Sequence, residues 1–299
     1  MGQKFLYRLY IGALRIPALL PLGVLYLLSD AIYFFIYHVI HYRKDTVREN
    51  LLNAFPEKSP EERKAVEKRF YRHLGDCIVE TVKLLHISDR EIDRRVEVAN
   101  PGVIDAIAAE GRSIVLYLGH YGNWEWMQAI RRHFRKPQVA GQIYKPMRDP
   151  VMEKVMLKIR SRFNMLCIPQ KKAYRTLLGF HERNRQFIIG FISDQRPNGG
   201  YQHWTSFLNQ ETAYIVGGEQ IGKRVGAAFL YLDVEKDRRG HYILTLREIV
   251  PPPELMQGEY PYTRQFMSML EQTIRREPAY WLWSHKRWKV KRSDCESNK

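Results

Sequence analysis

Short apolar runs alternate with amphipathic stretches along most of the chain. Residues 114–118 and 187–193 carry no charge, are rich in branched and aromatic side chains, and are followed by turn residues. This pattern is typical of buried strands. Residues 139–144, 227–234 and 242–250 have a similar character and predict further strands. The chain therefore carries the strands of a central sheet.

The stretches between these strands have helical periodicity. Apolar side chains recur every three or four residues between Val66 and Leu85, which predicts an amphipathic helix. Ser59, Pro60 and Glu62 precede it as a capping box with proline at the first helical position. Because strands and helices alternate, we predict an α/β fold with a mixed central sheet flanked by helices. The other predicted helices cover residues 127–134, 151–163, 212–223 and 262–275.

The N-terminal stretch is the most apolar part of the chain. Residues 16–29 and 31–42 carry no Lys, Arg, Asp or Glu, and Asp30 interrupts them. A spanning helix needs about 20 apolar residues, and Pro17 and Pro21 disturb a simple span. A single span, an interfacial helix and a buried helix therefore stay open, and both flanks are basic, so no orientation follows. We expect no cleaved signal peptide, and we predict a membrane-associated segment over residues 1–42 and a second domain over residues 43–299.

The strongly positive net charge of the chain indicates an anionic partner. The chain has 48 Lys and Arg against 32 Asp and Glu, a net charge of +16. Nucleic acid, an anionic membrane surface and an acidic protein all fit. Tryptophans and cations interleave over residues 280–292, which suits a membrane interface or single-stranded nucleic acid. Three cysteines without metal spacing favour a reducing compartment, and no dinucleotide or P-loop fingerprint is present, so we predict neither a metal nor a cofactor.

The candidate chemistry lies directly after the predicted strand 114–118. His120 follows Gly119, and Glu125 follows five residues after the histidine. On a helix these two would point about 140° apart, so they cooperate only if His120 lies in the turn and Glu125 in the first helical turn. In that arrangement Glu125 would accept the Nδ1 proton of His120, and the free nitrogen would act as a general base. The alternative is that both residues are structural.

Two further charged residues are candidates for the same site. Asp194 follows the predicted strand 187–193 just as His120 follows its own strand, and the carboxyl ends of strands converge on ligand sites. The alternative is that Asp194 only turns the chain. Arg160 lies on the basic helix predicted over residues 151–163, where a guanidinium could bind phosphate or simply face solvent.

The segment around the histidine resembles a known motif. Residues 119–126, GHYGNWEW, are similar to the H-x4-[D/E] motif of the late (lauroyl/myristoyl) lipid A biosynthesis acyltransferases, within the lysophospholipid acyltransferase superfamily. Four other segments resemble that family's motifs in the family's order. They are RKDTVRENLLNAFP at 43–56, YKP followed by DP at 144–150, SDQ at 193–195 and WSHKRWK at 283–289. The resemblance covers nearly the whole chain.

The resemblance implies an enzyme with named site residues. His120 would be the base, and Glu125 its orienting carboxylate. An essential arginine falls best on Arg160, although Arg162 is near it, and Lys145 and Arg148 would help Arg160 to hold a phosphate of the acceptor. Asp194 would shape the site, and Ser193 stands where the family usually has proline.

The resemblance also implies partners and a location. The donor would be acyl-acyl carrier protein, which is acidic, and the acceptor a hydroxyl of a lipid A precursor on an anionic membrane surface. The location would be the bacterial inner membrane, with the catalytic domain on the cytoplasmic side, and no nucleic acid is expected. A lysophospholipid or aminolipid acceptor stays open, as does a non-enzymatic basic protein that binds membranes or nucleic acid.

Overall fold

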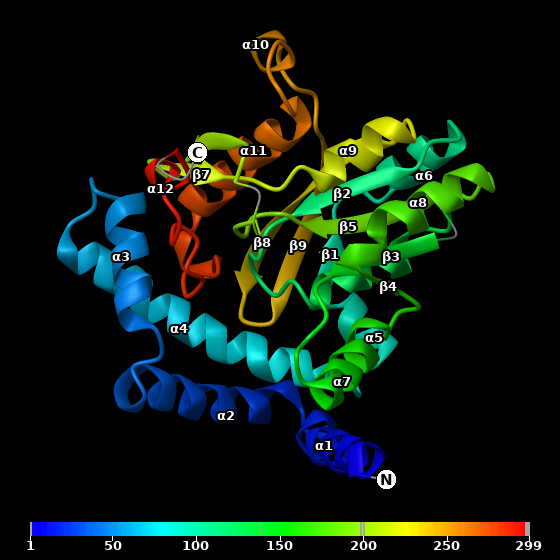
Figure 1. The fold of residues 1–299 in the computed structure, drawn as a ribbon. Coiled ribbons are helices and arrows are strands. Elements are labelled where there is room, and N and C mark those ends of the chain that lie inside the picture. Colours follow the sequence, from blue (N-terminus) through cyan, green and yellow to red (C-terminus); the bar gives the residue numbers. More distant parts are fainter. Residues whose placement is uncertain (1, 138, 198, 200, 297–299) are drawn as a thin grey trace.

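A computed structural model describes residues 2–137, 139–197, 199 and 201–296. Within these residues, seven strands form one sheet in the order β1-β9-β8-β2-β5-β3-β4 (Figure 1). The strands are β1 Val96–Val98, β2 Ile114–Leu118, β3 Val139–Tyr144, β4 Leu166–Pro169, β5 Phe187–Ile192, β8 Ala228–Arg238 and β9 His241–Glu248.

The sheet is mixed, as predicted. The strands from β8 to β4 in this order run parallel to one another. β9 is antiparallel to β8 and parallel to β1. Every residue of β2 is buried, because helices cover both faces of the central sheet, and this explains the uninterrupted apolar runs.

The helices that surround the sheet confirm most of the predicted ones. The capping box is present, since the Ser59 side chain accepts the Glu62 N–H and the Ser59 N–H donates to the Glu62 carboxylate at 2.7 Å. The α-helices are α3 Lys44–Ala54, α4 Pro60–Lys83, α5 Asp89–Asp93, α6 Gly102–Ala109, α7 Pro150–Arg160, α8 Ala173–Glu182, α9 Gly217–Arg224, α10 Pro253–Met256, α11 Pro261–Arg276 and α12 Arg292–Glu296. The 3₁₀ helices are η2 Trp126–His133, η3 Gln170–Lys172 and η4 Pro278–Tyr280.

One predicted helix begins too early. Residues 212–213 belong to β7 (Gln210–Ala213), which pairs with β6 (Trp204–Phe207) in an antiparallel hairpin, and α9 starts only at Gly217. Leu208 and Asn209 form the two-residue turn with φ of 50° and 61°. Such a left-handed turn matches the twist of a hairpin, and helical periodicity in the sequence could not indicate it.

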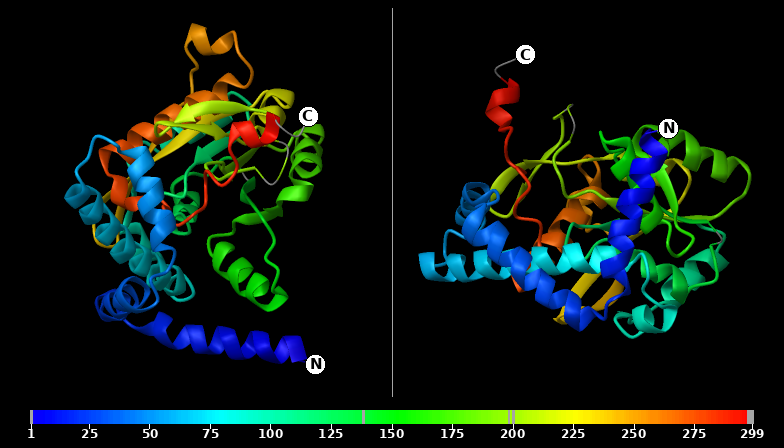
Figure 2. Two further views of the ribbon diagram at one scale, coloured as in Figure 1. Left: turned by 60° about the vertical axis from the view of Figure 1, so that its left-hand side comes forward. Right: turned by 90° about the horizontal axis from the view of Figure 1, so that it is seen from below.

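The N-terminal stretch forms α1 (Gly2–Leu19), α2 (Leu22–Phe34) and a π-helical turn over Phe35–Val39. Residues 22–39 are long and apolar enough to cross a membrane by length and composition. However, α2 lies along α4 at the edge of the folded domain, and α1 continues along the same margin (Figures 1 and 2). The Tyr26 hydroxyl donates to Glu80 at 2.9 Å, and the Ser29 hydroxyl donates to Asp76 at 2.8 Å. These contacts hold α2 against α4.

Candidate active site

His120 and Asp194 meet at the carboxyl ends of two neighbouring strands. β2 and β5 are parallel, and Leu118 is in register with Ile192. Each polar residue comes two positions after its strand's last residue, so the register brings them side by side. His120 Nδ1 lies 2.6 Å from Asp194 Oδ1, and the His120 backbone N–H donates to Asp194 Oδ2 at 2.8 Å. Asp194 therefore fixes both the ring and the backbone of the histidine.

The surroundings of Asp194 keep it ionised. Its side chain is 1% exposed, and the indole N–H of Trp281 donates to Oδ2 at 2.8 Å. Burial by itself raises the pKa of this carboxyl group, but the charge and hydrogen bonds of His120 and the Trp281 hydrogen bond outweigh burial and hold the pKa below its usual value. A carboxylate at Nδ1 requires a proton there, so neutral His120 carries its lone pair on Nε2.

The Nε2 side of His120 faces the cavity. The amide nitrogen of Gln195 lies 3.2 Å from Nε2, and the Trp124 ring packs edge-on against the imidazole at 5.2 Å between centroids. The His120 side chain is 17% exposed. The nitrogen that carries the lone pair is thus next to a space that a ligand can enter.

The predicted contact between Glu125 and His120 is wrong, because Glu125 pairs with Arg160 instead. Arg160 Nε donates to the two carboxylate oxygens at 3.1 and 3.0 Å, and Nη2 donates to Oε1 at 2.6 Å. The physical reason is the turn between the two residues. The side-chain oxygen of Asn123 accepts the backbone N–H of Glu125, and η2 begins there, so the glutamate points toward α7 rather than back toward the histidine.

The Glu125–Arg160 pair is largely shielded from solvent. The side chains are 8% and 21% exposed. Burial by itself lowers the pKa of Arg160, but the hydrogen bonds and charge of Glu125 raise it above its usual value. Arg160 therefore keeps its positive charge beside the carboxylate.

A cavity of about 560 Å³ brings most of the predicted residues together. His120, Glu125, Lys145 and Arg160 line it, and Asp194 lies directly behind His120. Arg148 is not among the lining residues. His285 of the C-terminal segment also lines the cavity, and burial lowers its pKa to about 4, so it is neutral at pH 7.

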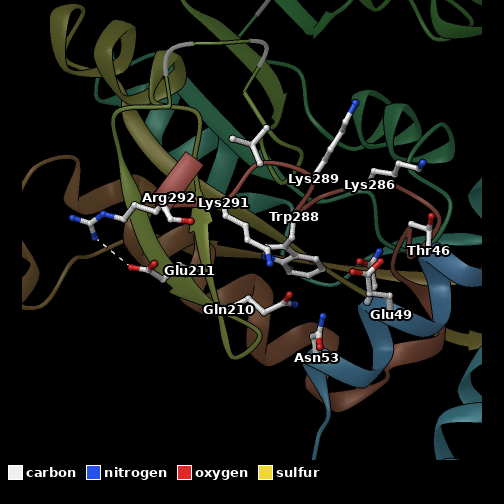
Figure 3. A pocket seen from close by; sticks show the side chains of 13 residues that line it. Thr46, Glu49, Asn53, Gln210, Glu211, Lys286, Trp288, Lys289, Lys291 and Arg292 are labelled. Atoms are coloured by element: carbon white, nitrogen blue, oxygen red, sulfur yellow. Dashed lines mark hydrogen bonds and ion pairs between the residues drawn. The ribbon is translucent and has the colours of Figure 1, made fainter. Parts of the chain in front are cut away.

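A second cavity, of about 650 Å³, lies between α3, the β6–β7 hairpin and the C-terminal segment (Figure 3). Trp288, Lys286, Lys289 and Glu49 are among its lining residues. It is larger, but its lining includes none of the predicted site residues. The predicted acid–base residues therefore lie at the other cavity, the one beside His120.

The residues that hold the turn between His120 and Glu125 were not predicted from the sequence. Glu80 of α4 is fully buried, and its carboxylate accepts the Asn123 amide and the Tyr242 hydroxyl, both at 2.8 Å. The Glu80 backbone carbonyl accepts the indole N–H of Trp126 at 2.8 Å. The only sequence signal was that Glu80 lies among the apolar residues Ile78, Val79 and Val82 of the predicted amphipathic helix. Trp281, which donates a hydrogen bond to Asp194, gave no signal beyond the interleaved tryptophans and cations of residues 280–292.

Comparison with known proteins decides the family. Residues 1–290 match the sequence model of the bacterial lipid A biosynthesis acyltransferases. The chain is 24% identical over 297 residues to the lipid A biosynthesis palmitoleoyltransferase of Escherichia coli (strain K12), covering 97% of this chain and 95% of that protein. It is also 24% identical over 285 residues to the lipid A biosynthesis lauroyltransferase of the same organism, covering 94% and 90%. The chain belongs to the bacterial lipid A biosynthesis acyltransferase family.

Membership of the lipid A acyltransferase family confirms the resemblance and the enzyme class. The protein is an acyltransferase of lipid A biosynthesis, and the non-enzymatic interpretation is set aside. Among the residues that the structure describes, no group of three or more His, Cys, Asp or Glu is placed to hold a metal ion. The roles of His120, Glu125, Arg160, Asp194, Lys145 and Arg148 stay predictions, which the geometry above now makes specific.

Proposed function

We propose that this acyltransferase moves a fatty acyl chain from acyl-acyl carrier protein to a hydroxyl of a lipid A precursor, with His120 as general base. The observation that carries the proposal is the contact of 2.6 Å between His120 Nδ1 and the buried Asp194 carboxylate, with Nε2 facing a cavity. This arrangement fixes the tautomer of the imidazole, so that the lone pair of its neutral form points toward the ligand. A positioned base of this kind contributes about 10²–10⁴-fold to the rate.

The acyl chain passes directly from the donor to the acceptor, in two stages. Nε2 of His120 takes the hydroxyl proton as the acceptor oxygen bonds to the thioester carbonyl carbon. Asp194 stabilises the resulting imidazolium. The carbon–sulfur bond then breaks, the imidazolium proton goes to the departing sulfur, and the products are an ester and a thiol. The sequence has no serine or cysteine in a nucleophile elbow, which favours this route over a covalent acyl-enzyme.

In this proposal Glu125 acts on the acceptor site through Arg160. Glu125 engages Nε and Nη2 of Arg160 and so fixes the plane of the guanidinium. A fixed guanidinium loses little freedom when it binds a phosphate oxygen with its remaining donors. Lys145 lines the same cavity and supplies a second cation toward a phosphate.

We propose that residues 1–42 bind the cytoplasmic face of the bacterial inner membrane as interfacial helices. Large apolar side chains remain exposed on both helices, among them Phe5, Ile16 and Leu27 at 68%, 70% and 71%. A perpendicular span would separate α2 from α4 and place Asp30, which pairs with Arg239 at 2.6 Å, in hydrocarbon. Helices that lie flat keep these contacts and still bury their apolar faces in the lipid surface.

The experiment that tests the function is a transfer assay with the full chain. Membranes that contain wild type, His120→Ala or the control His181→Ala, an exposed histidine of α8, receive labelled acyl-acyl carrier protein. They are offered a lipid A precursor and a lysophospholipid side by side. We expect transfer to the lipid A precursor by wild type and His181→Ala, and a loss of about 10²–10⁴-fold in His120→Ala.

Each other outcome contradicts a different part of the proposal. Transfer only to the lysophospholipid would contradict the acceptor and keep the base. An active His120→Ala would contradict the base. If wild type transfers no label to either acceptor from acyl-acyl carrier protein but does so when an acyl-coenzyme A thioester replaces it, the donor would be contradicted.

A further inference from the structure

The side-chain amide of Gln195 lies next to His120 Nε2, the nitrogen that takes the proton in the proposed function. Its amide nitrogen lies 3.2 Å from His120 Nε2. It directly follows Asp194, whose carboxylate is fixed by His120 and Trp281, so the backbone of Gln195 is fixed as well. Its side chain is partly exposed and lines the cavity of about 560 Å³. The base and this amide are thus neighbours at a ligand-accessible position.

The direction of this contact follows from the tautomer. Since Asp194 requires the proton on Nδ1, Nε2 of neutral His120 can only accept, and the Gln195 amide must donate to it. A hydroxyl that gives its proton to Nε2 must come to about 2.6–3.2 Å from the same lone pair. The Gln195 amide therefore occupies the position that the acceptor hydroxyl needs, and it must give way when the acceptor binds.

The displaced amide is left beside the developing negative charge. The carbonyl oxygen of the thioester is two bonds from the acceptor oxygen once that oxygen attacks the carbonyl carbon. A donor that a hydroxyl has just displaced from Nε2 needs only a side-chain rotation to reach this oxygen. Donors placed about 2.7–3.1 Å from such an oxyanion each contribute about 10²–10³-fold to the rate.

We propose that Gln195 is a further catalytic residue, which covers the lone pair of His120 in the free enzyme and donates its amide N–H to the oxyanion in the transition state. This rests on the proposed function, with His120 as base. No additional reactant is involved: the amide proton stays on Gln195, and the negative charge leaves when the carbon–sulfur bond breaks. The same contact also protects the base from solvent until an acceptor hydroxyl displaces the amide.

The test compares two substitutions at Gln195 in the full-chain enzyme, with carrier-protein donor and lipid acceptor both varied. Gln195→Met has a similar length but no donor, whereas Gln195→His restores an N–H. Gln257→Met, an exposed position at the end of α10, is the matched control. We expect kcat to fall about 10²–10³-fold in Gln195→Met with little change in KM, and Gln195→His to recover at least about tenfold of this loss.

A pH profile gives a readout that a merely structural role would not move. A donor at Nε2 favours the neutral imidazole, so its removal favours protonation of His120 in the free enzyme. The acidic limb of kcat/KM should therefore move to higher pH in Gln195→Met. The other charged and titratable groups of the site are unchanged in this variant: Asp194 at Nδ1, and Glu125, Lys145, Arg160, Arg196 and His285 in the lining of the cavity. The control should keep the wild-type limb.

The outcomes separate this proposal from the proposed function. If His120→Ala is inactive but Gln195→Met keeps kcat within about threefold of wild type and an unmoved acidic limb, only the role of Gln195 is overturned. If His120→Ala stays active, the base is overturned, and the role of Gln195 with it. If Gln195→Met mainly raises KM, Gln195 binds substrate and does not stabilise the transition state.

Discussion

Two buried carboxylates each hold a nitrogen-bearing side chain that lines the same cavity, and the two pairs differ in whether they can transfer a proton. In one, the buried carboxylate of Asp194 faces His120, and in the other the buried carboxylate of Glu125 faces Arg160. Histidine exchanges its proton near neutral pH, whereas arginine keeps its charge at every accessible pH. The first pair can therefore transfer a proton during turnover, and the second can only hold a charge in place.

The two pairs also differ in how far apart their members lie in the sequence and in what brings them together. His120 and Asp194 are 74 residues apart and meet because β2 and β5 are neighbours in register. Glu125 is only five residues from His120, but the Asn123 turn directs it toward α7. Closeness in sequence therefore did not indicate which carboxylate serves the histidine, and the strand pairing did.

The largest effect should follow from breaking the first pair. In Asp194→Asn the side chain can present an amide N–H to Nδ1, which favours the wrong tautomer and moves the proton to Nε2. We expect kcat to fall about 10²–10⁴-fold with a small change in KM. Steady-state kinetics with both substrates varied would measure this. A kcat near the wild-type value would show that Asp194 does not set the tautomer of the base.

Breaking the second pair should have a smaller effect, and on a different parameter. Arg160→Met and Glu125→Gln should each lower kcat/KM about 10–100-fold, mainly through KM for the lipid acceptor. Because both act through one contact, the double variant should be little worse than Arg160→Met, with a coupling energy of about 1–3 kcal/mol in the cycle. Additive losses would indicate that Glu125 acts apart from Arg160, for instance on His120.

The pairs can also be compared through the pH dependence of folding. The pKa of Asp194 is below its usual value in the folded protein, so the unfolded chain binds a proton first as the pH falls. Its contribution to the free energy of unfolding is therefore complete above the unfolded pKa of about 4 and is lost only as the pH falls below that value. Urea unfolding of wild type and Asp194→Asn at several pH values should give a difference that is present at pH 5 and shrinks as the pH falls below about 4. A difference that is absent at pH 5 would contradict the low pKa.

The strands were the most predictable part of this fold. Residues 114–118 and 139–144 are strands with the predicted bounds. In residues 114–118 every side chain is buried, and burial on both faces of a parallel sheet leaves a plain apolar run. The β6–β7 hairpin was missed, since its two-residue turn at Leu208 and Asn209 lacks glycine and proline. Local composition therefore predicts buried strands well, but it does not predict a turn of unusual composition.

The sequence indicated which residues belong to the site, but not which of them contact one another. The convergence of His120 and Asp194 followed from two strand ends, but their contact required knowing that β2 and β5 are neighbours. The support from Glu80, which holds the Asn123 turn from α4, depends on how a helix packs against a sheet. No local pattern in the sequence encodes such packing, so these contacts emerge only from the folded chain.

The smallest effects on KM should come from substitutions at Lys145 and Arg148, and they should differ between these two residues. Lys145 lines the cavity at His120, whereas Arg148 is not among its lining residues and is exposed. We expect Lys145→Ala to raise KM for a phosphorylated acceptor about fivefold, and Arg148→Ala to change it less than twofold, because a cation outside the cavity is screened by water and salt. The same measurement with a dephosphorylated acceptor is the control, and there the effect of Lys145→Ala should vanish. An equal effect of both substitutions would mean that the acceptor's phosphate lies outside the cavity, beyond the reach of the Glu125–Arg160 pair, and that this pair has a different role from the one assigned to it.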